Sequence, residues 1–100
     1  MLRHVVLFRW KPETGAEKIR EIEDAFRALP ARIPQIADFE WGRDVSVQGL
    51  SQGFTHCFVV SFASEADRDT YAPHPDHAAF IAQSRPYVDG LLVLDYFVGA

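Results

Sequence analysis

The stretch from Tyr71 to Phe80 holds the densest set of reactive side chains in the chain. It reads Tyr-Ala-Pro-His-Pro-Asp-His-Ala-Ala-Phe and combines a phenol, two imidazoles and a carboxylate. An imidazole has a reference pKa of about 6.5 and exchanges a proton near neutrality, whereas a phenol of pKa about 10 serves better as a hydrogen-bond donor. Tyr71 and His77 are therefore candidates for general acid–base chemistry. In the alternative interpretation they bond to each other or to the backbone and only close one end of the core, and spacing does not decide between the two.

A helix is expected to carry His77. Pro75 lacks a backbone N–H, which the first turn of a helix does not need, so the helix should begin at His74 or Pro75. His77 then lies in the first turn, with its side chain beside groups that pack on a core. The pattern predicts that this helix continues towards Val88 with a distortion at Pro86, and that Gly90 ends it.

The rest of the chain alternates between strand and helix patterns. Period-two alternation predicts strands over residues 2–11, 36–47, 54–62 and 91–98, and helical patterns predict helices near residues 14–29 and 65–71. Thr14 is the expected cap of the first helix and Ser64 of the second, while Gly42 is expected to mark a bulge or a bend. The order strand, helix, strand, strand, helix, strand is that of an α+β, ferredoxin-like βαββαβ fold. Such a fold is a four-stranded antiparallel sheet with helices on one face.

The predicted strands are apolar on both faces, although helices can cover only one. The face away from the helices carries Val5, Leu7, Cys57, Val59, Leu92 and Leu94. A patch of this kind is unfavourable in water, so a second subunit should cover it. We therefore predict a homodimer through the sheet face away from the helices.

Length and composition narrow the classes of function. One hundred residues suffice for one domain with one core, and a net charge of −4 argues against nucleic acid as a partner. No apolar run has the length of a signal peptide or membrane span, so no membrane partner is expected. The lone Cys57 cannot form an intramolecular disulfide, which favours a cytoplasmic location.

Several separated segments then point to a family. They are Arg3-His4-Val5-Val6-Leu7-Phe8, Phe39-Glu40-Trp41-Gly42-Arg43-Asp44-Val45, Gly53-Phe54-Thr55-His56, Tyr71-Ala72-Pro73-His74-Pro75-Asp76-His77 and Leu94-Asp95-Tyr96. Together they resemble the stress-responsive, dimeric α/β-barrel (Dabb) family over nearly the whole chain, and residues 1–100 are identified as one Dabb domain. The resemblance implies a ferredoxin-like protomer whose sheet closes into a barrel across a dimer.

The resemblance also implies site residues, because one plant member is a polyketide cyclase that closes a ring by an intramolecular aldol reaction. Tyr71 and His77 match its catalytic pair. The implied substrate-binding residues are His4, Val6, Phe8, Ile22, Phe26, His56, Phe58, Val60, His74, Phe80, Leu91 and Val93. The alternative interpretation of His4 and His56 is that each is a core histidine with a hydrogen-bond partner, because buried polar groups are usually paired. This chain departs from the cyclase in carrying Glu23 and Gln83 at apolar positions and Val88 at the position of a bulkier aromatic residue.

Three functions follow as hypotheses. The first is a Dabb-type stress-responsive protein with an apolar pocket for a small hydrophobic ligand, in which cyclase-like acid–base chemistry on a carbonyl compound needs no cofactor. The second is a non-catalytic, stress-induced dimeric structural or binding protein. The third is a monooxygenase of the related dimeric ferredoxin-like type, acting on a haem or quinol-like ligand. We expect no metal site, because His74 and His77 have no third defined ligand.

Overall fold

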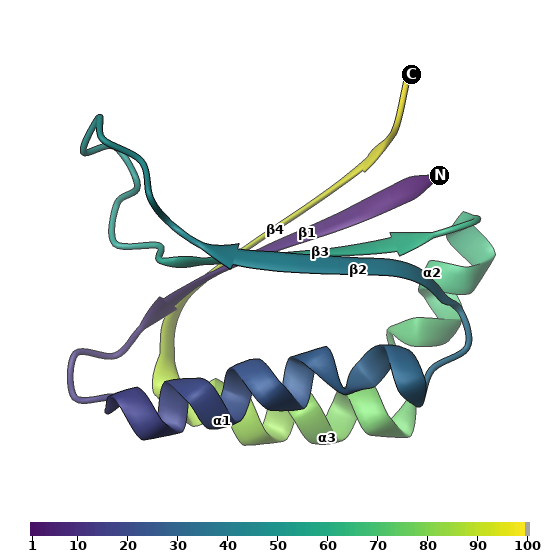
Figure 1. Cartoon of the computed structure of the whole chain (residues 1–100). Coiled ribbons are helices and arrows are strands. Elements are labelled where there is room, and N and C mark those ends of the chain that lie inside the picture. The colour runs from purple at the N-terminus through teal and green to yellow at the C-terminus, as the bar shows by residue number, and fades with distance from the viewer. Residues whose placement is uncertain (100) are drawn as a thin grey trace.

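Helices pack against one face of a four-stranded sheet and leave the other face open (Figure 1). The computed structural model describes residues 1–99 of the chain. The strands are β1 (Leu2–Trp10), β2 (Ile36–Arg43), β3 (His56–Phe62) and β4 (Val88–Phe97), and the helices are α1 (Ala16–Arg27), α2 (Glu65–Tyr71) and α3 (Pro75–Ser84). Short 3₁₀ turns cover Leu29–Ala31 and Arg85–Tyr87. The strand order is β2-β3-β1-β4 and every pairing is antiparallel, so the α+β ferredoxin-like fold is confirmed.

The core lies between the sheet and helices α1 and α3. Aromatic side chains dominate it, and the Phe26 ring of α1 lies 4.3 Å from Phe58 of β3 and 4.5 Å from Phe80 of α3. Burial of such a side chain contributes roughly 1.5–3 kcal/mol. Because Phe26 and Ile22 recur at helical spacing, α1 presents one apolar face to the sheet. No helix within residues 1–99 is long and apolar enough to cross a membrane.

Strand β4 lies at the sheet edge beside β1, and its side chains alternate between the two faces. Leu91 and Val93 face the helix side but remain 58% and 50% exposed, because α1 and α3 do not extend over this edge. Leu92 and Leu94 face the open side and are also exposed. The edge of the sheet therefore has room for a site on its helix side.

The end of α3 differs from the sequence prediction. The helix stops at Ser84 and a 3₁₀ turn follows, because Pro86 cannot supply the N–H that a continuing helix needs. Gly90 does not end a helix but lies within β4. A Cβ at this position would lie 2.6 Å from the Arg9 guanidinium carbon. Glycine therefore allows the Arg9 side chain to pass close to the backbone of β4.

Two further predictions about local structure were wrong, and one was confirmed. The N-cap residue of α1 is Gly15 and not Thr14, and no side chain caps this helix. The Thr14 hydroxyl instead donates to the Tyr87 carbonyl at 3.2 Å. Gly42 pairs in regular register, while the irregularity of β2 falls near its start. Ser64 caps α2 as predicted, since its hydroxyl oxygen accepts from the Asp67 N–H at 3.2 Å.

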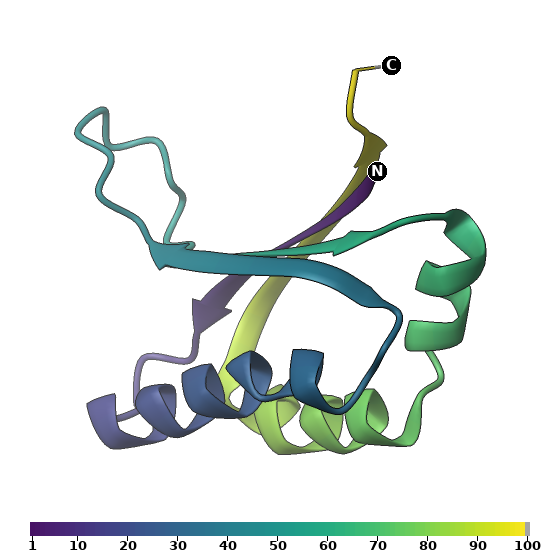
Figure 2. The same ribbon diagram turned by 45° about the vertical axis from the view of Figure 1, so that its right-hand side comes forward.

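Strand β2 ends at Arg43 instead of continuing to residue 47, and residues 44–55 form an arm. Figure 2 shows this arm rising from the sheet on the side opposite the helices. Its Val45 and Val47 side chains are 89% and 96% exposed. Arg9 supports the base of the arm, with its guanidinium 4.9 Å from the Phe54 ring centre.

Candidate functional site

A cavity of about 390 Å³ opens between the helix side of β1 and β4 and the adjoining face of α3. This volume is within the ordinary range for small-molecule sites. Many of the predicted site residues line it: Tyr71, His77, His4, Val6, Phe8, Phe26, Phe80, Leu91 and Val93. The polar side chains of Tyr71, His77 and His4 thus lie beside apolar lining residues at one end of the cavity.

Tyr71 is the last residue of α2 and is only 2% exposed. Its ring packs 5.1 Å from Phe62 and 4.1 Å from His77. Burial raises the pKa of Tyr71 well above 10, so the phenol stays protonated at physiological pH. Among residues 1–99 no group accepts or donates a hydrogen bond at its buried hydroxyl. Buried polar groups are normally paired, so this hydroxyl is available to a ligand.

His77 lies in the first turn of α3, and the backbone determines its tautomer. Its Nδ1 is 2.9 Å from the Ala72 carbonyl oxygen, which can only accept, so Nδ1 carries the hydrogen and Nε2 holds the lone pair. Burial lowers the pKa of His77; the Ala72 carbonyl opposes this effect, and the nearby His4 and His74 add to it. His77 is therefore neutral at physiological pH and can accept a proton on Nε2.

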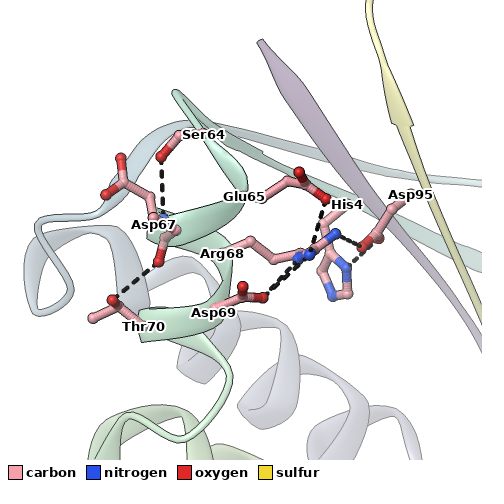
Figure 3. A network of polar contacts seen from close by, with 9 residues as sticks. His4, Ser64, Glu65, Asp67, Arg68, Asp69, Thr70 and Asp95 are labelled. Atoms are coloured by element: carbon pink, nitrogen blue, oxygen red, sulfur yellow. Dashed lines mark hydrogen bonds and ion pairs between the residues drawn. The ribbon is translucent and has the colours of Figure 1, made fainter.

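His4 is held from the opposite wall by a polar network (Figure 3). Its Nδ1 lies 2.6 Å from Asp95 Oδ1, and the other carboxylate oxygen accepts from Arg68 at 3.2 Å. Arg68 also contacts Asp69 and Glu65 on its own helix. Because the ionised carboxylate accepts only, His4 donates through Nδ1. The network fixes the His4 ring 6.0 Å from that of Tyr71.

His74 caps α3 and does not line the cavity. Its Nδ1 accepts from the Asp76 backbone N–H at 3.1 Å, so it satisfies one of the donors left free at the start of the helix. His74 thereby helps to fix the start of α3, and with it the position of His77 in the first turn. The predicted start of the helix at His74 or Pro75 agrees with this, although histidine is not among the residues preferred as caps.

His56 lies towards the other end of the sheet and bonds to Glu23. Trp10 Nε1 can only donate, and it is 3.1 Å from His56 Nδ1. His56 therefore donates through Nε2 to Glu23 Oε2 at 2.6 Å, and Arg43 reaches the same oxygen at 2.8 Å. Glu23 is only 4% exposed, so this pairing compensates its burial. Glu23, which replaces an apolar residue of the cyclase, thus belongs to a structural cluster outside the cavity.

The other predicted substrate-binding residues are part of the packed core. Ile22, Phe58 and Val60 are fully buried and do not line the cavity. They support its walls from behind.

Some lining residues were missed from the sequence. Ser84, Arg85, Asp89 and Gly90 line the end of the cavity where α3 gives way to β4. Ser84 is seven residues after His77 and so lies on the same helical face, and this spacing is the signal in the sequence for its place in the lining.

The described residues hold no group of three His, Cys, Asp or Glu side chains placed to bind a metal ion.

The sequence and the fold are similar to those of known proteins. A family model described as the stress responsive A/B barrel domain, Dabb, matches residues 2–98. The chain belongs to the Dabb family. The resemblance noted from sequence segments is therefore confirmed.

Two relatives of this Dabb protein carry different names. The stress-response A/B barrel domain-containing protein HS1 of Arabidopsis thaliana is 36% identical over 95% of this chain and 87% of its own length. Olivetolic acid cyclase of Cannabis sativa is 30% identical over 95% of this chain and 94% of its own length.

Solved structures are similar over almost the whole protomer. A hydroxynitrile lyase from Passiflora edulis has a TM-score of 0.92 and 27% identity, covering 98% of this chain and 93% of its own. A dimeric ferredoxin-like protein of unknown function from Thermobifida fusca has a TM-score of 0.82 and 28% identity, covering 97% and 90%. The Dabb fold therefore accommodates proteins named as enzymes as well as proteins of unknown function.

Proposed function

We propose that this Dabb protein binds a small, partly hydrophobic carbonyl compound in the cavity and that Tyr71 and His77 perform acid–base chemistry on it without a cofactor. The observation that carries the proposal is the Tyr71 hydroxyl, which is buried and unpaired among residues 1–99 and stacks against an imidazole whose free nitrogen is Nε2. The Tyr71 hydroxyl can donate a hydrogen bond to a carbonyl oxygen, and His77 Nε2 can take a proton from the carbon next to that carbonyl.

An aldol closure illustrates the chemistry that these groups can do. His77 Nε2 takes a proton from the carbon next to a carbonyl, and the C–H electrons form an enolate whose oxygen accepts a hydrogen bond from Tyr71. The enolate carbon then attacks a second carbonyl of the same molecule, and a C–C bond forms. The oxygen of that second carbonyl becomes an alkoxide and takes the proton from the His77 imidazolium. The apolar wall excludes water and strengthens the hydrogen bond from Tyr71.

His4 gives the site a second imidazole with a different partner. The His4 ring bonds to the Asp95 carboxylate, whereas the His77 ring bonds to a backbone carbonyl. We assign His4 to binding and orienting the ligand, with Asp95 and Arg68 as positioning residues.

The relatives support chemistry at this site. One relative is named as a cyclase and one structural neighbour as a lyase. The stress-response relatives equally support a binding protein without turnover, and the experiment below separates these possibilities.

We also propose that the functional unit is a homodimer through the open sheet face. Solved neighbours described as dimeric support the homodimer. A groove of about 610 Å³ between the arm and the open face is lined by apolar side chains such as Leu7, Leu50 and Val59, and a second copy would fill it. A cytoplasmic location is part of the proposal, since the single Cys57 remains a free thiol.

An NMR titration of His77 tests the proposed chemistry. Wild type, Tyr71→Phe and the control Tyr87→Phe are titrated with a panel of aromatic and polyketide-like acids. We expect ligand-dependent shifts at His77 that weaken in Tyr71→Phe and persist in Tyr87→Phe, since Tyr87 does not line the cavity. Compounds that shift His77 are then assayed for ring closure. Shifts without turnover would indicate a binding protein, and the absence of any shift would contradict the proposal.

A further inference from the structure

We infer that the cavity takes an elongated ligand with a carbonyl at one end and a negatively charged group, such as a carboxylate, at the other, and that Arg85 binds the negative group. The inference rests on the proposed function, because it takes the end at Tyr71 and His77 as the carbonyl site.

The two ends of the cavity lie at opposite ends of α3. His77 is in the first turn, and Arg85 directly follows the last residue, Ser84. They are eight residue steps apart, which corresponds to about 12 Å at 1.5 Å per residue. The facing strand β4 has a similar span, because the four residue steps from Leu91 to Asp95 rise about 13 Å. A ligand that reaches both ends must therefore be long and narrow.

The middle of the cavity is apolar. Phe80 and Ile81 line it from α3, Val6 from β1, and Leu91 and Val93 from β4. None of these side chains offers a hydrogen bond, so this section favours a hydrocarbon or aromatic segment over a polar chain.

The far end has an excess of positive charge. Among residues 1–99, no carboxylate lies within ion-pair distance of the exposed Arg85, and its guanidinium has no hydrogen bond. Asp89 is the acidic residue lining this end, but its carboxylate is neutralised by Arg9 at 2.8 Å. Ser84, which is only 5% exposed, adds a hydroxyl at this end. This hydroxyl donates only a long hydrogen bond, of 3.4 Å, to the Ile81 carbonyl. A carboxylate is the group that pairs best with such a guanidinium and hydroxyl.

Arg85 is the cation that both lines the cavity and has no carboxylate partner within the described residues. The other Lys and Arg side chains without such a partner do not line the cavity; they are Arg3, Lys11, Arg20 and Arg32. A cation after a helix also interacts favourably with the helix dipole, so a purely structural role for Arg85 has to be tested separately.

The experiment compares ligands that differ only at the far end. The probes are ω-oxodecanoate, its methyl ester and decanal, and the dissociation constant of each is measured by calorimetry at neutral pH while NMR follows His77. The proteins are the wild-type chain, Arg85→Gln, Arg85→Lys and the control Arg32→Gln. We expect the wild type to bind the acid about tenfold more tightly than the ester. Arg85→Gln should abolish this preference, Arg85→Lys should retain part of it, and Arg32→Gln should leave it unchanged.

The outcomes separate this inference from the proposed function. Equal affinity for acid and ester with a shift at His77 would overturn the inference alone. A preference for the acid that survives in Arg85→Gln would do the same. If none of the probes binds or shifts His77, the proposed carbonyl site fails and the inference fails with it. A stability change in Arg85→Gln without any change in ligand preference would assign Arg85 to the helix dipole.

Discussion

Replacing Tyr71 by phenylalanine should make the protein more stable while it removes the proposed donor. The hydroxyl is buried and has no partner within the described residues. An unpaired buried hydroxyl costs about 1–3 kcal/mol, and the substitution removes it while keeping the ring that packs on Phe62 and His77. Allowing for partial compensation by water, we expect the free energy of unfolding to rise by about 1 kcal/mol.

Urea unfolding at pH 7, with protein concentration held constant, measures this change. A gain of about 1 kcal/mol corresponds to a rise of about 4–8 °C in the melting temperature of a domain of this size. The control Tyr87→Phe should change stability by less than about 0.5 kcal/mol. A loss of 1 kcal/mol or more in Tyr71→Phe would refute the reasoning, because it would mean that the hydroxyl is satisfied in the resting protein.

Three other predictions address the dimer, the buried cluster and pH. Val59→Asp should shift the sedimentation mass from dimer to monomer, since it buries an unpaired charge in the proposed interface; an unchanged dimer would mean that another face is used. Glu23→Leu should lower the free energy of unfolding by about 1–3 kcal/mol in urea, because His56 loses the acceptor of its Nε2 hydrogen; a neutral effect would contradict the assigned tautomer. Turnover or ligand binding that needs neutral His77 should be constant above pH 6.5 and fall below it, since burial lowers the pKa of His77; a midpoint above 6.5 in the pH profile would contradict this assignment.

The order of elements was predictable because each strand and helix shows its own period of apolar residues. The start of α3 and the cap at Ser64 were also predictable, since both depend on local chemistry. The distortion at Pro86 was predictable for the same reason, and α3 ends just before it. The role of Gly90 was not predictable, because it depends on Arg9, a residue distant in sequence and adjacent in space.

The candidate site divides in the same way. The resemblance to a family identified Tyr71 and His77, but only three-dimensional structure reveals that the Tyr71 hydroxyl is unpaired and that Ala72 sets the tautomer of His77. His56 matched a site histidine by sequence, yet it bonds to Glu23 and Trp10 outside the cavity. The identity of a residue was thus easier to infer than its partners.

In the proposed dimer, strand β4 would link ligand affinity thermodynamically to self-association. Its alternate residues, such as Val93 and Leu94, face the cavity on one side and the proposed dimer interface on the other. Both sets are exposed in the isolated protomer, so pairing with β1 holds the backbone of this edge strand while its side chains have few packed neighbours. A second copy that orders one side of the strand would reduce the entropy cost of ordering the other side around a ligand. Apparent affinity should consequently weaken on dilution, and by reciprocity a bound ligand should tighten the dimer by the same factor.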